Sequence, residues 1–106
     1  MTVHTYHTSG GKDLIRDYLD DLPLREAAEG YYILECLEEE GLSFLGNLST
    51  RQLERKLWEI KYPKHNRLFY VLIDEENIYI LHACKKQKGK AEKFEMDKAK
   101  RRLSEI

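Results

Sequence analysis

Three runs of β-forming residues follow one another in the second half of the chain, at residues 56–62, 67–73 and 78–84. Each is short, rich in aromatic and branched residues, and separated from the next by four polar turn residues, which is typical of consecutive antiparallel strands. The middle run, RLFYVLI, is apolar on both faces after its first residue. That pattern indicates a central strand covered on each side. The chain is therefore constrained to build its core around a small β-meander.

The segment before the meander has a helical period. Apolar residues recur every three or four positions over about residues 12–21 and again over 24–40. Pro23 separates the two segments and Gly41 follows the second. Proline suits the first turn of a helix and glycine suits its C-terminal cap. The pattern predicts two helices that form an antiparallel hairpin.

The remaining segments complete the predicted order. Residues 2–8 (TVHTYHT) alternate like a short strand, residues 42–48 resemble a packed loop, and residues 91–103 have one apolar side, like a helix. Residues 49–55 fit either a short helical turn or the lead-in to a strand. We expect one α+β domain over residues 1–106, with an N-terminal strand and a helical hairpin before an antiparallel β-meander and a C-terminal helix.

Composition supports a single globular domain. The 106 residues are 42% hydrophobic and 35% charged, which is enough apolar surface for one core. Cys36 and Cys84 lie far apart and are expected to be reduced core thiols. No apolar leader or membrane-length run is present, so we expect a cytoplasmic protein that does not contact the membrane.

The net charge of −1 averages two unlike halves. Residues 1–50 contain three basic and ten acidic side chains, whereas residues 51–106 contain fifteen basic and nine acidic ones. Such asymmetry suggests that one face of the protein meets a polyanion. The alternative is that charge is segregated by chance onto solvated faces.

Cations border the predicted strands, at Lys61, Lys64, His65, Arg67, Lys85, Lys86, Lys88 and Lys90. In a meander, the start of the second strand and the end of the third lie at the same end of the sheet. We therefore expect Arg67 and the Lys85–Lys86 pair to converge on one anion-sized pocket. The alternative reading of the lysine run is a solvated turn.

Glu59, Lys61 and Arg67 allow two interpretations. Residues two apart on a strand share a face, and the arginine opens the next strand of the hairpin. Arg67 could bind a phosphate with its planar guanidinium and stabilise charge in a transition state. Alternatively, Glu59 neutralises Arg67 in a structural ion pair.

The histidines and tyrosines carry weaker signals. His82 has the strand parity of Ile78 and Ile80, which favours a hydrogen-bonded, half-buried residue over a base. His65, in the turn beside the arginine, is the better acid–base candidate. Tyr62, Tyr70 and Tyr79 could stack on bases or belong to the core. No set of residues has metal-ligand spacing, so no metal or cofactor is expected.

The segments KLWEIKY, NRLFYVLI and IYILHACKKQKGKA, ahead of a charged helix, resemble the RelE/HigB-like toxins of bacterial type II toxin–antitoxin systems, in particular their phage-related subgroup. The resemblance covers about residues 53–103. It implies a small sheet wrapped by helices. It also implies cleavage of mRNA, commonly on the ribosome, which inhibits translation, and a cognate antitoxin that blocks the toxin.

The resemblance also assigns roles to residues. It matches the arginine and tyrosine of the family's R-x-x-Y strand to Arg67 and Tyr70, and its paired lysines to Lys85 and Lys86. Glu59 stands at the glutamate of the L-W-E-L-R strand. These five residues are the catalytic candidates. The RNA-binding candidates are Lys61, Lys64, His65, Tyr79, Lys88 and Lys90.

The expected function is a metal-independent endoribonuclease in which cations assist attack of a ribose 2′-hydroxyl on the adjacent phosphate. The expected partners are mRNA, the ribosome and a helix-turn-helix antitoxin, with operator DNA reached only through that antitoxin. One alternative is a non-catalytic module that binds the antitoxin or RNA. Another is a phage structural component.

Overall fold

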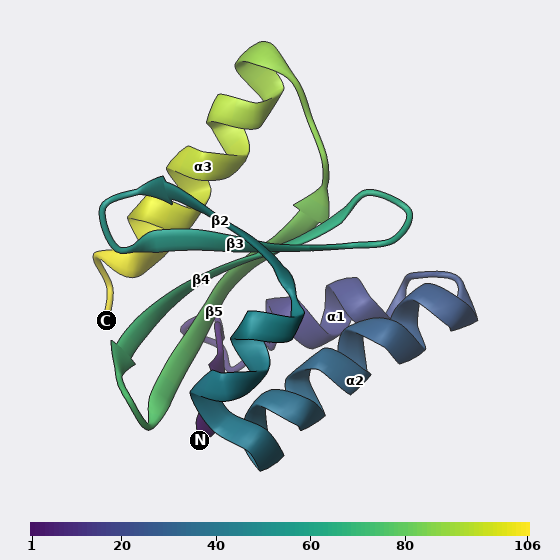
Figure 1. Cartoon of the computed structure of the whole chain (residues 1–106). Helices are drawn as coiled ribbons and strands as arrows, with labels where there is room; N and C mark the ends of the chain where they lie inside the picture. The colour runs from purple at the N-terminus through teal and green to yellow at the C-terminus, as the bar shows by residue number, and fades with distance from the viewer.

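The computed structural model describes residues 1–106 and shows a five-stranded sheet between two layers of helix (Figure 1). Helices α1 and α2 cover one face of the sheet and α3 covers the other (Figure 1). The strands are β1 (Thr2–Thr5), β2 (Ser49–Glu54), β3 (Leu57–Tyr62), β4 (Asn66–Asp74) and β5 (Asn77–Lys85). The helices are α1 (Leu14–Asp20), α2 (Leu24–Glu40), a 3₁₀ helix (Gly41–Asn47) and α3 (Gly89–Leu103).

The strand order is β1-β5-β4-β3-β2, and β2 to β5 form an antiparallel meander. The α+β architecture predicted from the sequence is confirmed. The prediction was incomplete at residues 49–55, of which Ser49–Glu54 form the edge strand β2. This segment, STRQLE, is mostly exposed and lacks apolar alternation, because an edge strand needs to bury little. At the opposite edge, β1 pairs with β5 in parallel.

The central strand β4 has a core on each of its faces, as its sequence predicted. Leu68 and Tyr70 pack with α1 and α2 in the larger apolar cluster. Phe69 and Val71 pack under α3 in the smaller cluster, together with Ala99 from the helix. Because β4 is buried on both sides, it fixes the positions of its neighbours β3 and β5.

A β-bulge in β5 reverses the facing of its second half. Phe69 stands opposite His82, but Tyr70 stands opposite Ile80, so Leu81 is the extra residue. His82 consequently faces α3, where its ring meets Phe69 edge to face. The expectation that His82 shares the face of Ile78 and Ile80 was wrong, because simple alternation does not survive a bulge.

The helix ends follow local chemistry. The Asp13 carboxylate caps α1 by accepting hydrogen bonds from the backbone N–H groups of Ile15 and Arg16, at 3.0 and 2.9 Å. Gly41 ends α2 with a φ of 73°, a left-handed conformation that glycine adopts readily.

Both cysteines are buried and unpaired, as expected. None of the helices has the combination of length and apolar character that a bilayer crossing requires.

We predict that Gly30→Ala destabilises the protein by about 1–3 kcal/mol, although alanine is the better helix former. A Cβ at Gly30 would lie 2.5 Å from Leu19 Cδ2 and 2.9 Å from the Tyr62 hydroxyl, where α2 approaches α1 and β3. Gly46→Ala is the matched control, since no atom lies within 4 Å of its Cβ position. Urea unfolding measures both variants. Equal stabilities would contradict the close approach at Gly30.

Candidate functional site

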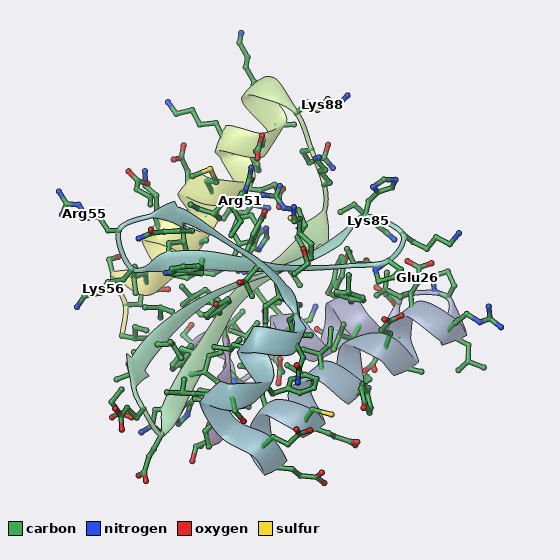
Figure 2. The ribbon with its side chains drawn as sticks, viewed as in Figure 1. Glu26, Arg51, Arg55, Lys56, Lys85 and Lys88 are labelled. Carbon is green, nitrogen blue, oxygen red and sulfur yellow. The ribbon has the colours of Figure 1, made fainter.

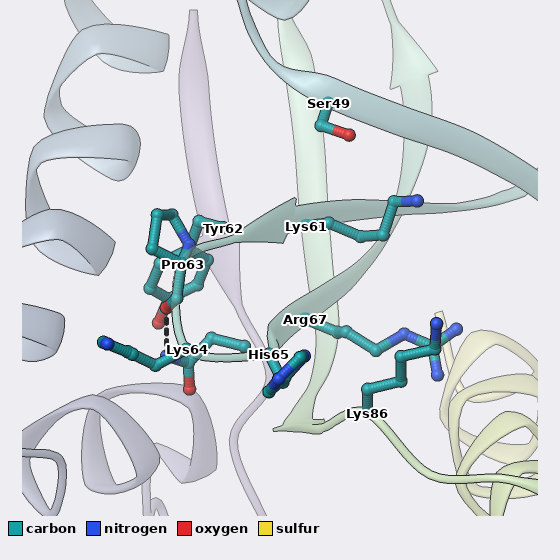
Figure 3. Close-up of a pocket in the computed structure, with 9 residues that line it drawn as sticks. Ser49, Lys61, Tyr62, Pro63, Lys64, His65, Arg67 and Lys86 are labelled. Carbon is teal, nitrogen blue, oxygen red and sulfur yellow. Dashed lines mark hydrogen bonds between the residues drawn. The ribbon is translucent and has the colours of Figure 1, made fainter.

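A cationic pocket of about 390 Å³ opens beside the turn between β3 and β4 (Figure 3). Four of its nine lining residues are lysine or arginine and none is acidic. The cations are Lys61, Lys64, Arg67 and Lys86, and His65 lies among them. Figure 3 shows the side chains of Lys61, Arg67 and Lys86 extending to the same side of the pocket. A concave surface with this charge is suited to an anion.

The turn that borders the pocket has an unusual backbone. Lys64 and His65 are consecutive residues with φ of 70° and 63°, and neither is glycine. Left-handed backbone at such residues costs about 1–3 kcal/mol each and persists only when surrounding contacts hold it. One such contact is made by the Asn66 side chain, which donates a hydrogen bond to the Pro63 carbonyl at 2.9 Å. Strain of this kind is concentrated at functional sites in proteins.

Residues at the end of β5 donate hydrogen bonds to the same turn. The Lys86 backbone N–H donates to the His65 carbonyl at 2.7 Å, and Lys85 Nζ donates to the Lys64 carbonyl at 2.9 Å. Lys85 Nζ also pairs with the Glu26 carboxylate of α2 (Figure 2). Lys85 is therefore occupied in fixing the turn and does not line the pocket. Its neighbour Lys86, the first residue after β5, lines the pocket instead.

A polar network from the helical layer completes the turn, and sequence reasoning missed it. Asn66 is fully buried and donates to Glu26 Oε1 at 2.8 Å, while its amide oxygen accepts from the Tyr18 hydroxyl at 2.6 Å. The hydrogen bonds from Lys85 and Asn66 lower the pKa of Glu26. The only sequence signal was an asparagine in a turn, which reveals nothing of its partners far along the chain.

Arg67 is the central residue of a buried ion network. Its side chain is 1% exposed, and its Nε and Nη2 bind the Glu59 carboxylate, which is 0% exposed. Arg51 Nε of β2 lies 2.9 Å from Glu59 Oε1, and Glu92 Oε1 of α3 lies 3.4 Å from Arg67 Nη2. The structural ion pair considered for Glu59 is therefore present. Arg67 Nη1 is also buried and has no hydrogen-bond partner within the protein.

The structure thus brings together Lys61, Lys64, His65, Arg67 and Lys86 from the residues that the sequence singled out. Lys61 stands directly opposite Arg67 on the neighbouring strand, which explains their proximity. Three segments supply this cluster: the end of β3, the turn with the start of β4, and the residue after β5.

The other sequence candidates lie elsewhere. Tyr70 is buried in the core on the opposite face of β4 from Arg67, and burial raises its pKa to about 12. Tyr79 lies near the start of β5, at the far end from the pocket, and stacks on His4 with ring centroids 5.4 Å apart. Lys88 and Lys90 are exposed at the start of α3. The expectation that Tyr70 acts beside Arg67 is not supported, because residues three apart on a strand face opposite ways.

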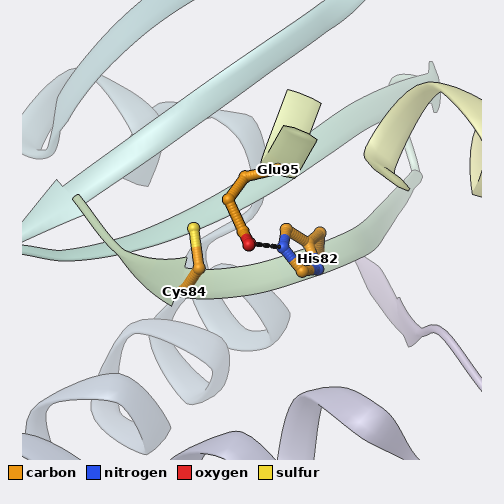
Figure 4. Close-up of side chains that lie close together, drawn as sticks. All are labelled: His82, Cys84 and Glu95. Atoms are coloured by element: carbon orange, nitrogen blue, oxygen red, sulfur yellow. Dashed lines mark hydrogen bonds and ion pairs between the residues drawn. The ribbon is translucent and has the colours of Figure 1, made fainter. Parts of the chain in front are cut away.

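His82, Cys84 and Glu95 form a second polar cluster beneath α3, with potential ligand atoms within 4.8 Å of one another (Figure 4). Arg102 Nη1 lies 3.0 Å from His82 Nδ1. A guanidinium only donates, so Nδ1 accepts, and the proton on Nε2 is donated to Glu95. A metal-binding histidine instead donates its second N–H to a carboxylate or carbonyl. Burial also raises the pKa of Cys84 to about 12. The donor set therefore fits a structural network better than a metal site.

This geometry defines the class of protein: a small α+β domain with a cationic pocket at one end of its meander. The sequence model of the family "Phage derived protein Gp49-like (DUF891)" matches residues 17–104. The chain belongs to this family, which is associated with toxins of toxin–antitoxin systems. No curated protein matches the chain.

We predict that Glu59→Ala destabilises the protein by about 3–5 kcal/mol, because it leaves Arg67 buried without its counter-charge. A Glu59→Leu/Arg67→Met double variant should recover most of this loss, since no isolated charge remains. Glu92→Ala is the control and should cost less than about 1 kcal/mol, as its contact with Arg67 is longer and partly exposed. Guanidinium chloride unfolding measures all three. A double variant as unstable as Glu59→Ala would contradict the ion-pair account.

We predict that the protein loses stability as the pH falls from 7.5 to 5.5. Burial lowers the pKa of His82 below its ordinary value of 6.5, although the Glu95 carboxylate opposes this shift. The unfolded chain therefore takes up a proton at a higher pH than the folded protein does. As a result, the free energy of unfolding decreases as the pH drops below about 6.5. His82→Gln should flatten the profile, whereas the exposed turn variant His65→Gln should keep it. If the wild type, His82→Gln and His65→Gln lose stability equally as the pH falls, His82 is not the group responsible.

Proposed function

We propose that this protein is the toxin of a toxin–antitoxin system and acts as a metal-independent endoribonuclease on mRNA. The observation that carries the proposal is the pocket itself. Four cations and a histidine line it without a single carboxylate, in a chain whose net charge is −1. A phosphodiester is one anion that such a pocket can bind, and the family's association with toxins supports this choice.

The proposed chemistry is transfer of the phosphoryl group within the RNA. The ribose 2′-oxygen forms a bond to the adjacent phosphorus, and the bond from phosphorus to the 5′-oxygen of the next nucleotide breaks. The 2′-hydroxyl loses a proton and the leaving 5′-oxygen gains one. Lys86 and Lys61, which are exposed in the pocket, stabilise the negative charge that builds up on the phosphate, and the buried guanidinium of Arg67 adds to the positive charge of the pocket.

Proton transfer in this scheme belongs to His65. Histidine exchanges protons near neutral pH, and His65 is the histidine that lines the pocket. The backbone of its turn is held next to Lys86, because the Lys86 backbone N–H donates to the His65 carbonyl. Tyr70 has no part in the scheme, because it lies in the core on the other face of the sheet.

The proposed partners follow from the same class. A helix-turn-helix antitoxin binds the toxin and covers the cationic pocket, and operator DNA is contacted only through that antitoxin. The RNA substrate is mRNA, engaged on the ribosome. The attraction between the cationic pocket and the negatively charged RNA backbone promotes this association at low salt.

A non-catalytic module that binds RNA or the antitoxin is the second candidate. The observation that favours it is the ion network around Arg67, because Glu59 and Glu92 offset most of that arginine's charge. A neutralised arginine holds a phosphate less strongly than a free one. The two candidates differ in whether RNA is cut.

We predict that Lys86→Ala and Lys61→Ala each reduce cleavage about 10²-fold, because each removes a charge from the transition state. Both side chains are exposed and make no ion pair within the protein, so the fold is retained. Lys56→Ala is the control, since Lys56 lies at the β2–β3 turn away from the pocket (Figure 2).

The measurement is growth after induction, combined with mapping of new 5′ ends on cellular transcripts. Growth arrest and new ends with the wild type and with Lys56→Ala, both lost in the pocket variants, support the enzyme. Growth arrest without new ends supports the binding module. If the pocket variants cut RNA as well as the wild type, the site is wrongly placed.

A further inference from the structure

The outer side of α3 carries a line of cations around one exposed aromatic ring. Lys90, Phe94, Lys98 and Arg101 are spaced by four, four and three residues, so they share one side of the helix. Phe94 is 59% exposed, and Lys98 Nζ lies 4.8 Å from the centroid of its ring. We refer to these four residues as the α3 stripe.

The cations of the α3 stripe make no ion pairs within the protein, and Lys98 lies over the ring of Phe94. Several other charged residues of α3 have partners: Glu92 meets Arg51, Lys100 meets Glu54, and Arg102 donates to the Leu81 carbonyl. Lys90, Lys98 and Arg101 form no ion pair. Lys93 on the same helix is also unpaired. These unpaired cations present a surface complementary to a polyanion.

The α3 stripe also continues from the pocket. Lys86 lines the pocket, Lys88 stands at the N-terminal end of α3 (Figure 2), and the stripe begins two residues later with Lys90. From Lys90 to Arg101 the helix advances about 16 Å. An extended nucleic-acid strand held in the pocket can therefore follow the helix along these cations. Asp97 is the acidic residue exposed beside them, and it lies 3.9 Å from Lys100.

We propose that the α3 stripe is a docking surface for single-stranded RNA next to the segment in the pocket, with Phe94 stacking on an unpaired base. The proposal rests on the proposed ribonuclease function and adds a binding site that lies outside the pocket. An acidic protein partner is the less favoured occupant. Lysine is depleted in the centres of protein interfaces, and one isolated aromatic ring is too small an apolar core for one. Aromatic rings between cations are what single-stranded RNA requires.

The test is fluorescence anisotropy with a labelled 2′-O-methyl RNA strand, which lacks the nucleophilic hydroxyl and stays intact. Phe94→Ala should weaken binding about tenfold, the size of one base–aromatic stack. Lys98→Gln should also weaken binding and make the slope of log affinity against log salt shallower by about 0.7, the value for one lost phosphate contact. Phe94→Ala should leave that slope unchanged, because stacking releases no counterions.

Matched controls come from the acidic half of the molecule. Tyr32→Ala removes an aromatic ring that is 58% exposed on α2, and Lys12→Gln removes a cation beside α1. Both should bind RNA like the wild type. Circular dichroism and thermal unfolding of each variant establish that the fold is intact.

The outcomes separate the two proposals. If Lys86→Ala weakens binding while Phe94→Ala and Lys98→Gln do not, the α3 stripe is not an RNA site and the pocket stands. If the wild-type protein binds no RNA at low salt, the proposed ribonuclease function fails together with the stripe. If Phe94→Ala loses affinity for a polyglutamate peptide but not for RNA, the stripe serves an acidic protein and the inference is overturned.

Discussion

The buried ion pair between Arg67 and Glu59 is the interaction on which the α3-facing side of this molecule depends. Neither charge is exposed, so each requires the other to offset the cost of leaving water. The pair joins the two central strands of the meander, and Arg51 and Glu92 extend it to the edge strand and to α3. It also fixes the direction of the guanidinium, which leaves Nη1 unpartnered. One interaction thus stabilises the sheet and orients the central group of the candidate site.

A second network determines the pocket from the opposite face of the sheet. Asn66, Glu26 and Lys85 tie the β3–β4 turn to α2 and to the end of β5. These contacts hold Lys64 and His65 in a conformation that their own side chains disfavour. Helices that contribute no residue to the pocket therefore decide its shape. The charge asymmetry of the sequence acquires a physical meaning here, since an acidic residue of the first half positions the cations of the second.

Much of the fold was accessible from local patterns, because those patterns report burial directly. The apolar run of β4 predicted a strand covered on both faces, and the helical period predicted α2 with its terminal glycine. The polar strand β2 was not identified, because an edge strand buries too little to leave a pattern. His82 was placed on the wrong face, since the bulge at Leu81 has no signature in the residues themselves.

The candidate site was also predicted only in part from the sequence. The sequence by itself determined the element order, the central strand and the presence of surplus cations at one end of the sheet, because alternation, helical period and charge are local properties of the chain. Only the tertiary structure decided which cations converge. It turned Lys86 toward Arg67 and Lys85 toward Glu26, buried Tyr70 in the core, and paired Arg67 with Glu59. Those choices depend on strand facing, a bulge and partners far apart in the chain, which become defined only when the layers pack together.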